Sequence, residues 1–201
     1  MRRRRSESGA ATVEIIFRCL EELASEKGID GLSMREVARR SEISLASLQR
    51  YFPTKASLFT AFVDRAVAIY RERVTRLEED RGASGSFESS LQFAAYETMA
   101  VARGGVLSMI EARIDRDEVA RDCYRNLMSA YLRMLQEAIE RRFPSISSSD
   151  AQRAAVMICS VLEGLPAAVF AADTMGKTEE SVISDAVMIA AGIPSAIQKG
   201  A

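Results

Sequence analysis

The chain contains no histidine among its 201 residues, and it has little cysteine, proline or glycine. The lack of histidine removes the commonest general base, the commonest metal ligand and every Ser-His or Cys-His nucleophilic pair. With only 4 Pro and 11 Gly, the composition is not typical of low-complexity or turn-rich all-β proteins. We therefore expect neither an enzyme that uses these common routes nor a protein that carries a cofactor.

The cysteines, Cys19, Cys123 and Cys159, are odd in number and far apart in the chain. Because no CxxC pair is present, the pattern indicates neither a disulfide framework nor a zinc site. We expect free thiols, buried or half-buried, in a reducing cytoplasm.

The net charge of −1 is unevenly distributed along the chain. Residues 1–60 hold 11 basic and 8 acidic side chains, whereas residues 61–201 hold 16 and 20. The basic excess is densest at Arg2 to Arg5, a run that can act as a flexible arm on phosphates or in a minor groove. A basic terminus without a role is the alternative interpretation.

Residues 33–59, SMREVARRSEISLASLQRYFPTKASLF, predict two short helices joined by a tight turn and followed at once by a third. Ser33 and Glu36 have the spacing of a capping box, and Ser44 can cap the second helix. The exposed positions of that helix carry small or hydrogen-bonding side chains that can reach base edges and phosphates: Ala46, Ser47, Gln49 and Arg50. This pattern is a helix-turn-helix, and it predicts DNA binding.

The rest of the chain also has helical periodicity. No window shows the sustained alternation of a strand, so the predicted fold class is all-α. Besides the helix-turn-helix, helices are expected at about residues 13–24, 54–80, 87–102, 105–113, 116–142, 150–172 and 178–192.

One apolar stretch, Ala154 to Ala172, is long enough in principle to cross a membrane. Glu163 and Pro166 lie near its middle, and a central carboxylate is costly in lipid. We therefore expect a helix buried between other helices or across a dimer, and no membrane partner. No apolar segment follows the basic start as it would in a secretory signal, so we expect a cytoplasmic protein.

The order of these elements resembles the TetR family of bacterial transcriptional regulators. The resemblance is specific over about residues 10–60 and rests on Val37-Ala38, Ile43-Ser44, Leu48, Tyr51-Phe52-Pro53, Lys55 and Leu58. The chain departs from the family pattern at Glu42, where Gly is most frequent, and at Gln49, where a phosphate-contacting Tyr is common. Ala46-Ser47 also replaces a frequent Gly-Thr.

The resemblance implies a basic arm at residues 1–9, a DNA-binding domain at 10–56 and a helical effector-binding and dimerisation domain at 57–201. It implies DNA contacts from Ser33, Arg35, Ser44, Ala46, Ser47, Gln49, Arg50, Tyr51 and Lys55. Capping alone is the alternative role for the two serines that begin helices, and a half-buried core position is the alternative for Tyr51.

The family also implies a homodimer through about residues 150–192, which would present two recognition helices to a palindromic DNA operator. The apolar composition of both helices independently favours a dimer, because a monomer would expose an aggregation-prone patch.

An unidentified small-molecule effector is implied among the helices of residues 87–172. The candidate ligand-binding residues are Phe93, Tyr96, Met99, Arg103, Met109, Arg113, Tyr124, Met128, Tyr131, Cys159 and Glu163. Methionine and aromatic side chains at helical spacing also fill ordinary cores. The two arginines can pair with an acidic effector or with nearby carboxylates, and Glu163 can serve a pocket or the dimer interface.

We therefore expect a ligand-responsive, homodimeric transcriptional repressor. The alternative is a helical small-molecule-binding or protein-interaction module that does not read DNA, an interpretation that the departures at Glu42 and Gln49 favour slightly.

Overall fold

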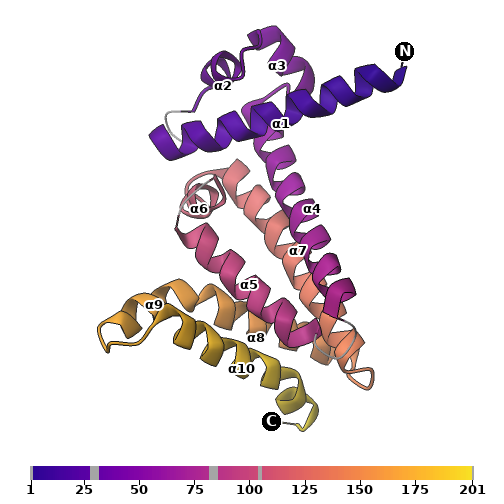
Figure 1. The fold of residues 1–201 in the computed structure, drawn as a ribbon, viewed down its shortest axis with the longest axis vertical. Coiled ribbons are helices and arrows are strands. Elements are labelled where there is room, and N and C mark those ends of the chain that lie inside the picture. The colour runs from indigo at the N-terminus through magenta and orange to yellow at the C-terminus, as the bar shows by residue number, and fades with distance from the viewer. Residues whose placement is uncertain (1, 28–31, 82–85, 104–105, 201) are drawn as a thin grey trace. The chain divides into compact units, whose positions relative to one another are not determined.

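The computed structural model describes residues 2–27, 32–81, 86–103 and 106–200. These residues form helices and turns without a strand, which confirms the predicted all-α class (Figure 1). In chain order the helices are α1 (Arg2–Lys27), α2 (Met34–Arg40), α3 (Leu45–Tyr51), α4 (Lys55–Arg81), α5 (Ser86–Ala102), α6 (Val106–Glu111), α7 (Glu118–Arg142), α8 (Ser148–Glu163), α9 (Leu165–Asp173) and α10 (Glu179–Gln198).

The chain divides into two compact units. Unit 1 consists of Met1–Ala66 and Gly104–Asn126, and unit 2 consists of Val67–Arg103 and Leu127–Ala201. Helices α4 and α7 therefore contribute residues to both units. The segment with α6 belongs to unit 1, where α6 packs against α1, although the resemblance placed this segment in the C-terminal domain.

Unit 1 has an apolar core beneath the helix-turn-helix. Leu20 of α1 and Leu48 of α3 are at most 1% exposed. The Phe17 ring lies 5.6 Å from the rings of both Phe52 and Phe62, tilted to the first and edge-on to the second. The apolar face of α1 thus holds the end of α3 and the start of α4, as its predicted periodicity requires.

The N-terminal residues differ from the flexible arm that the sequence predicts. Helix α1 begins at Arg2, so the backbone of residues 2–9 continues the first helix. Helix-compatible residues, with no proline and only Gly9 among them, allow this extension. The side chains of residues 2–8 lie outside the described residues, and a DNA contact from this segment stays a prediction.

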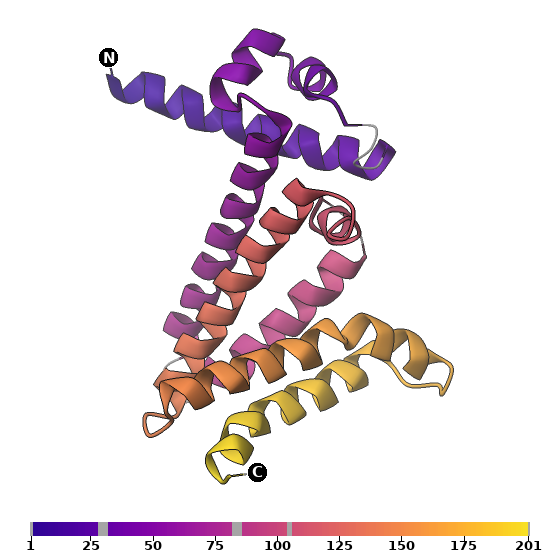
Figure 2. The ribbon, with the colours of Figure 1, turned by 180° about the vertical axis from the view of Figure 1, so that it is seen from behind.

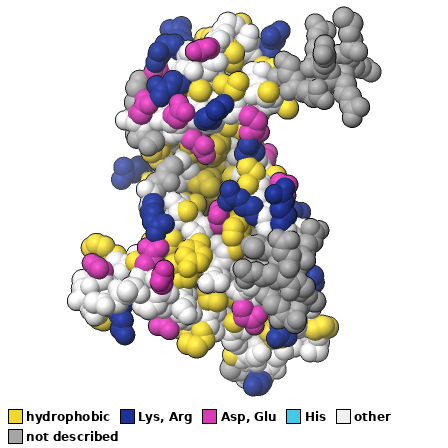
Figure 3. All heavy atoms as spheres, viewed as in Figure 1, with side chains coloured by type: hydrophobic (Ala, Val, Ile, Leu, Met, Phe, Trp, Pro, Cys, Tyr) yellow, Lys and Arg dark blue, Asp and Glu magenta, His cyan; other side chains and the backbone are white. Residues whose placement is uncertain are grey.

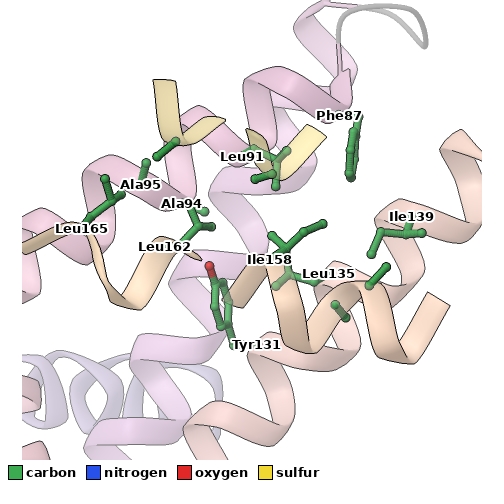
Figure 4. Close-up of a cluster of buried hydrophobic side chains, with 14 of the residues drawn as sticks. Phe87, Leu91, Ala94, Ala95, Tyr131, Leu135, Ile139, Ile158, Leu162 and Leu165 are labelled. Carbon is green, nitrogen blue, oxygen red and sulfur yellow. The ribbon is translucent and has the colours of Figure 1, made fainter. Parts of the chain in front are cut away.

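Unit 2 contains a helical bundle in which α10 packs along α8 and α5 (Figures 1 and 2). The core of this bundle is a cluster of buried side chains from α5, α7, α8, α9 and α10 (Figure 4). Leu91, Ile139, Ile158, Leu162 and Ile183 are at most 1% exposed. The apolar positions that recur along these helices therefore form the faces that are buried in the core.

The apolar stretch from Ala154 to Ala172 is interrupted at Gly164 and is not one uniform helix. Gly164 ends α8 and begins α9, and Pro166 lies in the first turn of α9, where its missing N–H costs no helical hydrogen bond. By length and composition alone, Ser148–Asp173 and Glu179–Gln198 could cross a membrane. Core helices of soluble proteins pass the same test, and both stretches supply buried residues to the core of unit 2. They do not indicate a membrane protein.

Candidate functional site

The turn between α2 and α3 is closed by backbone hydrogen bonds around a left-handed residue. Glu42 has a φ of 55°, a conformation that glycine adopts most readily. The Ile43 N–H donates to the Ala38 carbonyl at 3.0 Å, and the Glu42 N–H donates to the Arg39 carbonyl at 3.2 Å. This is the hydrogen-bond pattern of a Schellman cap. The departure at Glu42 therefore preserves the turn, at a strain of about 1 kcal/mol.

Serine side chains cap both helices of the motif, as the sequence predicts. Ser33 accepts a hydrogen bond from the Glu36 N–H at 3.2 Å, while the Glu36 carboxylate accepts one from Arg39. Ser44 accepts from the Ser47 N–H at 3.0 Å and donates to the Ser47 hydroxyl at 2.9 Å. The hydroxyls of Ser44 and Ser47 are thus engaged in starting α3, which reduces their freedom to reach a base.

The opposite faces of α3 have different environments. Leu48 is fully buried and Phe52, just past the helix, is 6% exposed, so these two side chains fix the helix to unit 1. Ala46, Gln49 and Arg50 are exposed. The outer face of α3 therefore offers a methyl group, a carboxamide and a guanidinium, which are side-chain groups that read base edges in a major groove.

The remaining predicted DNA-contact residues flank α3. Tyr51 is 39% exposed, with its ring centroid 6.4 Å from that of Phe52. Lys55 is half-buried, and its Nζ lies 5.6 Å from the centroid of the Phe59 ring. Arg35 on α2 is exposed. The structure thus brings the exposed predicted residues to the surface of one short motif.

Ion pairs occupy part of the basic charge of unit 1. Arg40 of α2 pairs with Glu22 and Glu26 of α1, and the hydrogen bonds to these carboxylates raise the pKa of its guanidinium. Within the described residues, Arg35 and Arg50 have no acidic partner, so their charges remain available to a phosphate. Figure 3 shows basic side chains beside acidic ones on the visible face of unit 1.

A second candidate site lies in unit 2, where aromatic and polar side chains from α4, α5, α7 and α8 converge. The Tyr70 ring lies 5.3 Å from the Phe93 ring and 5.9 Å, edge-on, from the Tyr131 ring. Cys159 and Glu163, one helical turn apart on α8, are near enough to Tyr131 to raise the pKa of its hydroxyl, although burial is the larger cause. We call these five residues the tyrosine cluster.

The Tyr131 hydroxyl has an unusual position in this cluster. Its residue is 8% exposed, and the hydroxyl oxygen has no hydrogen-bond partner among the described residues. A buried polar group without a partner costs about 1 to 3 kcal/mol, so native proteins contain few of them. Burial also raises the pKa of Tyr70 and that of Cys159, which makes ionisation of both groups more costly than in water.

The structure divides the predicted ligand-binding residues. Met99 and Met128 join the core of unit 2 beside the tyrosine cluster, whereas Met109, Arg113 and Tyr124 belong to unit 1. Tyr96 is 43% exposed on α5. Arg103 is exposed and pairs with Glu179 at the start of α10, which is a different carboxylate from those considered in the sequence.

Sequence reasoning did not include Tyr70 among the candidate ligand residues. Tyr70 lies in the helix expected at residues 54–80 and packs against the core of unit 2. The signal in the sequence was a tyrosine at a position that an aliphatic residue could fill. A buried phenol usually needs a polar partner, so such a tyrosine indicates a candidate site.

Comparisons with known proteins agree with the geometry of unit 1. The family described as bacterial regulatory proteins, tetR family, has a sequence model that matches residues 18–62. The HTH-type transcriptional repressor DrrR1 of Streptomyces coeruleorubidus is 32% identical over 92 residues, which cover 46% of this chain and only about a third, 32%, of that protein. An HTH-type transcriptional regulator in the dhlA 5′ region of Xanthobacter autotrophicus is 27% identical over 189 residues, which cover 89% of this chain and 92% of that protein.

The fold is shared over nearly the whole chain with a solved structure. A TetR-family transcriptional regulator from Syntrophomonas wolfei superposes with a TM-score of 0.73 at 12% identity, covering 93% of this chain and 96% of that one. At this identity the likeness shows the fold alone. The match to the family model and the caps of α2 and α3 concern the helix-turn-helix itself. The helix-turn-helix of this chain has the sequence of the TetR family of bacterial transcriptional regulators, which are DNA-binding proteins, and the fold of the chain agrees with that family.

Proposed function

We propose that this chain is a ligand-responsive, homodimeric transcriptional repressor that acts in the cytoplasm on a palindromic operator. The observation that carries this proposal is the outer face of α3, where Ala46, Gln49 and Arg50 are exposed above the buried Leu48. A glutamine suits adenine, an arginine suits guanine or a phosphate, and an alanine suits the thymine methyl. DrrR1 is described as a repressor, which supports repression as the direction of control.

Exposed apolar side chains support the homodimer. Val156 and Met157 of α8 are 51% and 52% exposed, and Met188 and Ile189 of α10 are 67% and 57% exposed. Large apolar side chains gathered on two helices are typical of a protein–protein interface. Figure 3 shows hydrophobic side chains at the surface around α9 and α10. A two-fold dimer would place two copies of α3 about 34–36 Å apart, one turn of DNA.

The tyrosine cluster supports the response to an effector. Convergent aromatic rings with a few polar groups are typical of small-molecule sites, and this cluster draws on four helices. An effector that binds one arrangement of the dimer better than another would shift the population away from the form that fits the operator. Coupling of this kind lowers operator affinity without any direct contact between effector and DNA.

The DNA-binding proposal is tested by selection from a random duplex pool with the purified full chain. We expect a palindrome to be enriched, and fluorescence anisotropy to give tighter binding to it than to a scrambled duplex. Affinity should fall steeply with salt, because each phosphate contact releases counterions. Failure to select any sequence over bulk competitor DNA would contradict operator binding and favour the protein-interaction alternative.

The repressor proposal needs a second readout. A promoter that carries the selected palindrome upstream of a reporter should be less active when the chain is expressed. Arg50→Ala, which removes an exposed charge that has no acidic partner among the described residues, should restore the reporter. Higher reporter activity in the presence of the wild-type chain would show an activator.

A further inference from the structure

The Tyr131 hydroxyl is the strongest sign of a specific ligand contact in unit 2. The side chain is buried on α7, and its hydroxyl oxygen has no hydrogen-bond partner among the described residues. Figure 4 shows the hydroxyl directed away from α7, toward the part of the core that holds Ala94 of α5 and Leu162 of α8. A phenol that served packing alone would gain from being phenylalanine, because the hydroxyl loses its hydration and gains no partner.

The surroundings of this hydroxyl select an aromatic ligand. The Tyr70 ring lies 5.9 Å from the Tyr131 ring, and on another side it lies 5.3 Å from the Phe93 ring. The nearby core side chains Ala94, Ala95 and Leu162 are apolar and at most 2% exposed. Aromatic rings favour offset or edge contacts with another aromatic ring at such spacings.

The charges around the cluster disfavour an anion. Glu163 lies close enough to raise the pKa of both Tyr131 and Cys159, so its field opposes a second negative charge. Two arginines on the neighbouring helices α4 and α5 are already paired, Arg73 with Glu97 at 2.9 Å and Arg103 with Glu179. An acidic effector, which the sequence left open for Arg103, would have to break an existing ion pair.

We propose that Tyr131 donates its hydroxyl hydrogen bond to the carbonyl oxygen of an uncharged aromatic ligand held against Tyr70 and Phe93 in unit 2. This inference rests on the proposed effector response and specifies the chemical class of the effector. Tyr131 acts here as the residue that distinguishes a ligand with an acceptor from an equally apolar ligand without one. Such discrimination arises because an unmatched ligand leaves the buried hydroxyl unpaired.

The test compares matched naphthalene probes on the full chain by isothermal titration calorimetry. The probes are 2-acetylnaphthalene, naphthalene, 2-naphthoate and 2-naphthyltrimethylammonium. We expect the neutral ketone to bind most tightly, and Tyr131→Phe to weaken the ketone by about fivefold while leaving naphthalene unchanged. The control is Thr174→Val, which removes an exposed hydroxyl just past the end of α9 in unit 2 and should change neither probe.

The unliganded variant supplies a second readout. Without ligand, Tyr131→Phe should be at least as resistant to thermal unfolding as the wild type, because it deletes an unpaired hydroxyl. If the hydroxyl were purely structural, Tyr131→Phe would lower the unfolding temperature and leave the ketone affinity unchanged. This result would overturn the proposal. Binding of no probe, or tighter binding of 2-naphthoate or the ammonium probe, would also overturn it.

Operator binding by the same preparations separates this proposal from the proposed function. If the ketone binds through Tyr131 but leaves the anisotropy of the operator complex unchanged, the ligand site stands and the effector response fails. If operator binding responds to a ligand equally in wild type and Tyr131→Phe, the regulatory function stands and the role of Tyr131 fails.

Discussion

The hydroxyl oxygens of Ser44 and Ser47 lie 2.9 Å apart at the start of α3, with Ser44 as the donor. The same Ser44 oxygen accepts the Ser47 N–H at 3.0 Å, so one side chain makes two bonds to a residue three positions later. This pair links the local chemistry of the sequence to the orientation of the helix that carries the candidate base-reading residues. The two serines therefore have unequal roles, although both were predicted to face DNA.

Replacing Ser44 with Ala should lower the free energy of unfolding by about 1 kcal/mol, because the Ser47 N–H loses its acceptor at the helix start. Ser47→Ala is the matched control. It removes only the side-chain bond and should cost less than about 0.5 kcal/mol, as is usual for a substitution without a burial or capping role. Urea unfolding followed by circular dichroism measures both, and equal losses would contradict the capping role of Ser44.

Replacing Glu42 with Gly should stabilise the protein by roughly 0.5 to 1 kcal/mol. The residue has a φ of 55°, and glycine adopts that conformation without the contact between Cβ and the backbone. Ala46→Gly, at an exposed position inside α3, should destabilise the protein by about 1 kcal/mol, since glycine is a poor helix former. A loss of stability in Glu42→Gly, measured by the same urea titration, would show that the Glu42 side chain makes a compensating contact.

Two exposed polar residues of the motif should affect DNA binding in different ways. Gln49→Ala should relax base preference at one operator position by about 1 to 3 kcal/mol, because a bidentate base contact is lost. Arg35→Ala should weaken binding to all sequences alike and lower the salt slope by about one unit, as the loss of a phosphate contact does. Anisotropy titrations against single-base operator variants at several salt concentrations distinguish the two. An unchanged salt slope in Arg35→Ala would remove Arg35 from the DNA, and an unchanged base preference in Gln49→Ala would remove Gln49 from it.

The local features of this fold were predictable from the sequence. Ser33 and Ser44 each begin a helix as predicted, because a cap depends on residues two or three positions away. The buried positions of α1 and α3 followed from helical periodicity for the same reason.

Features that depend on distant residues were not predictable in this way. Arg103 pairs with Glu179, which is 76 positions away, because α5 and α10 pack together in unit 2. Tyr70 joins the tyrosine cluster, whereas Tyr124 lies in unit 1. Periodicity identifies which face of a helix is buried but does not identify the helices that pack against it. The candidate ligand-binding residues could therefore not be assigned to unit 1 or unit 2 from the sequence.

The proposed dimer can be tested by placing a charge on its apolar surface. Ile189→Glu puts a carboxylate on α10 at a side chain that is 57% exposed, so the fold of a protomer should be retained. Burial of that carboxylate in an interface should weaken dimerisation at least tenfold. Sedimentation equilibrium measures the change, with Ile15→Glu on α1, where the side chain is 40% exposed, as the control. A dimer unaffected by Ile189→Glu would exclude this part of α10 from the interface.

The Cys159 thiol should make the stability of the protein depend on alkaline pH. Burial, and to a lesser extent the Glu163 carboxylate, raises the pKa of this thiol to about 11, from an ordinary value of 9.0. A raised folded-state pKa means that the folded chain keeps its proton when the unfolded chain has lost it. The resulting contribution is therefore complete below pH 9 and is lost as the pH rises toward 11.

We expect the free energy of unfolding to fall between pH 9 and 11, and to fall less steeply in Cys159→Ala. Urea titrations under a reductant at intervals from pH 7 to 11 measure this slope. The pKa of Cys123 is also raised by burial, so the variant should reduce the pH dependence without removing it. Curves for wild type and Cys159→Ala that stay parallel over this interval would show that the thiol ionises equally in both states. In that case the environment of Cys159 would be more hydrated than its packing beside Tyr131 implies.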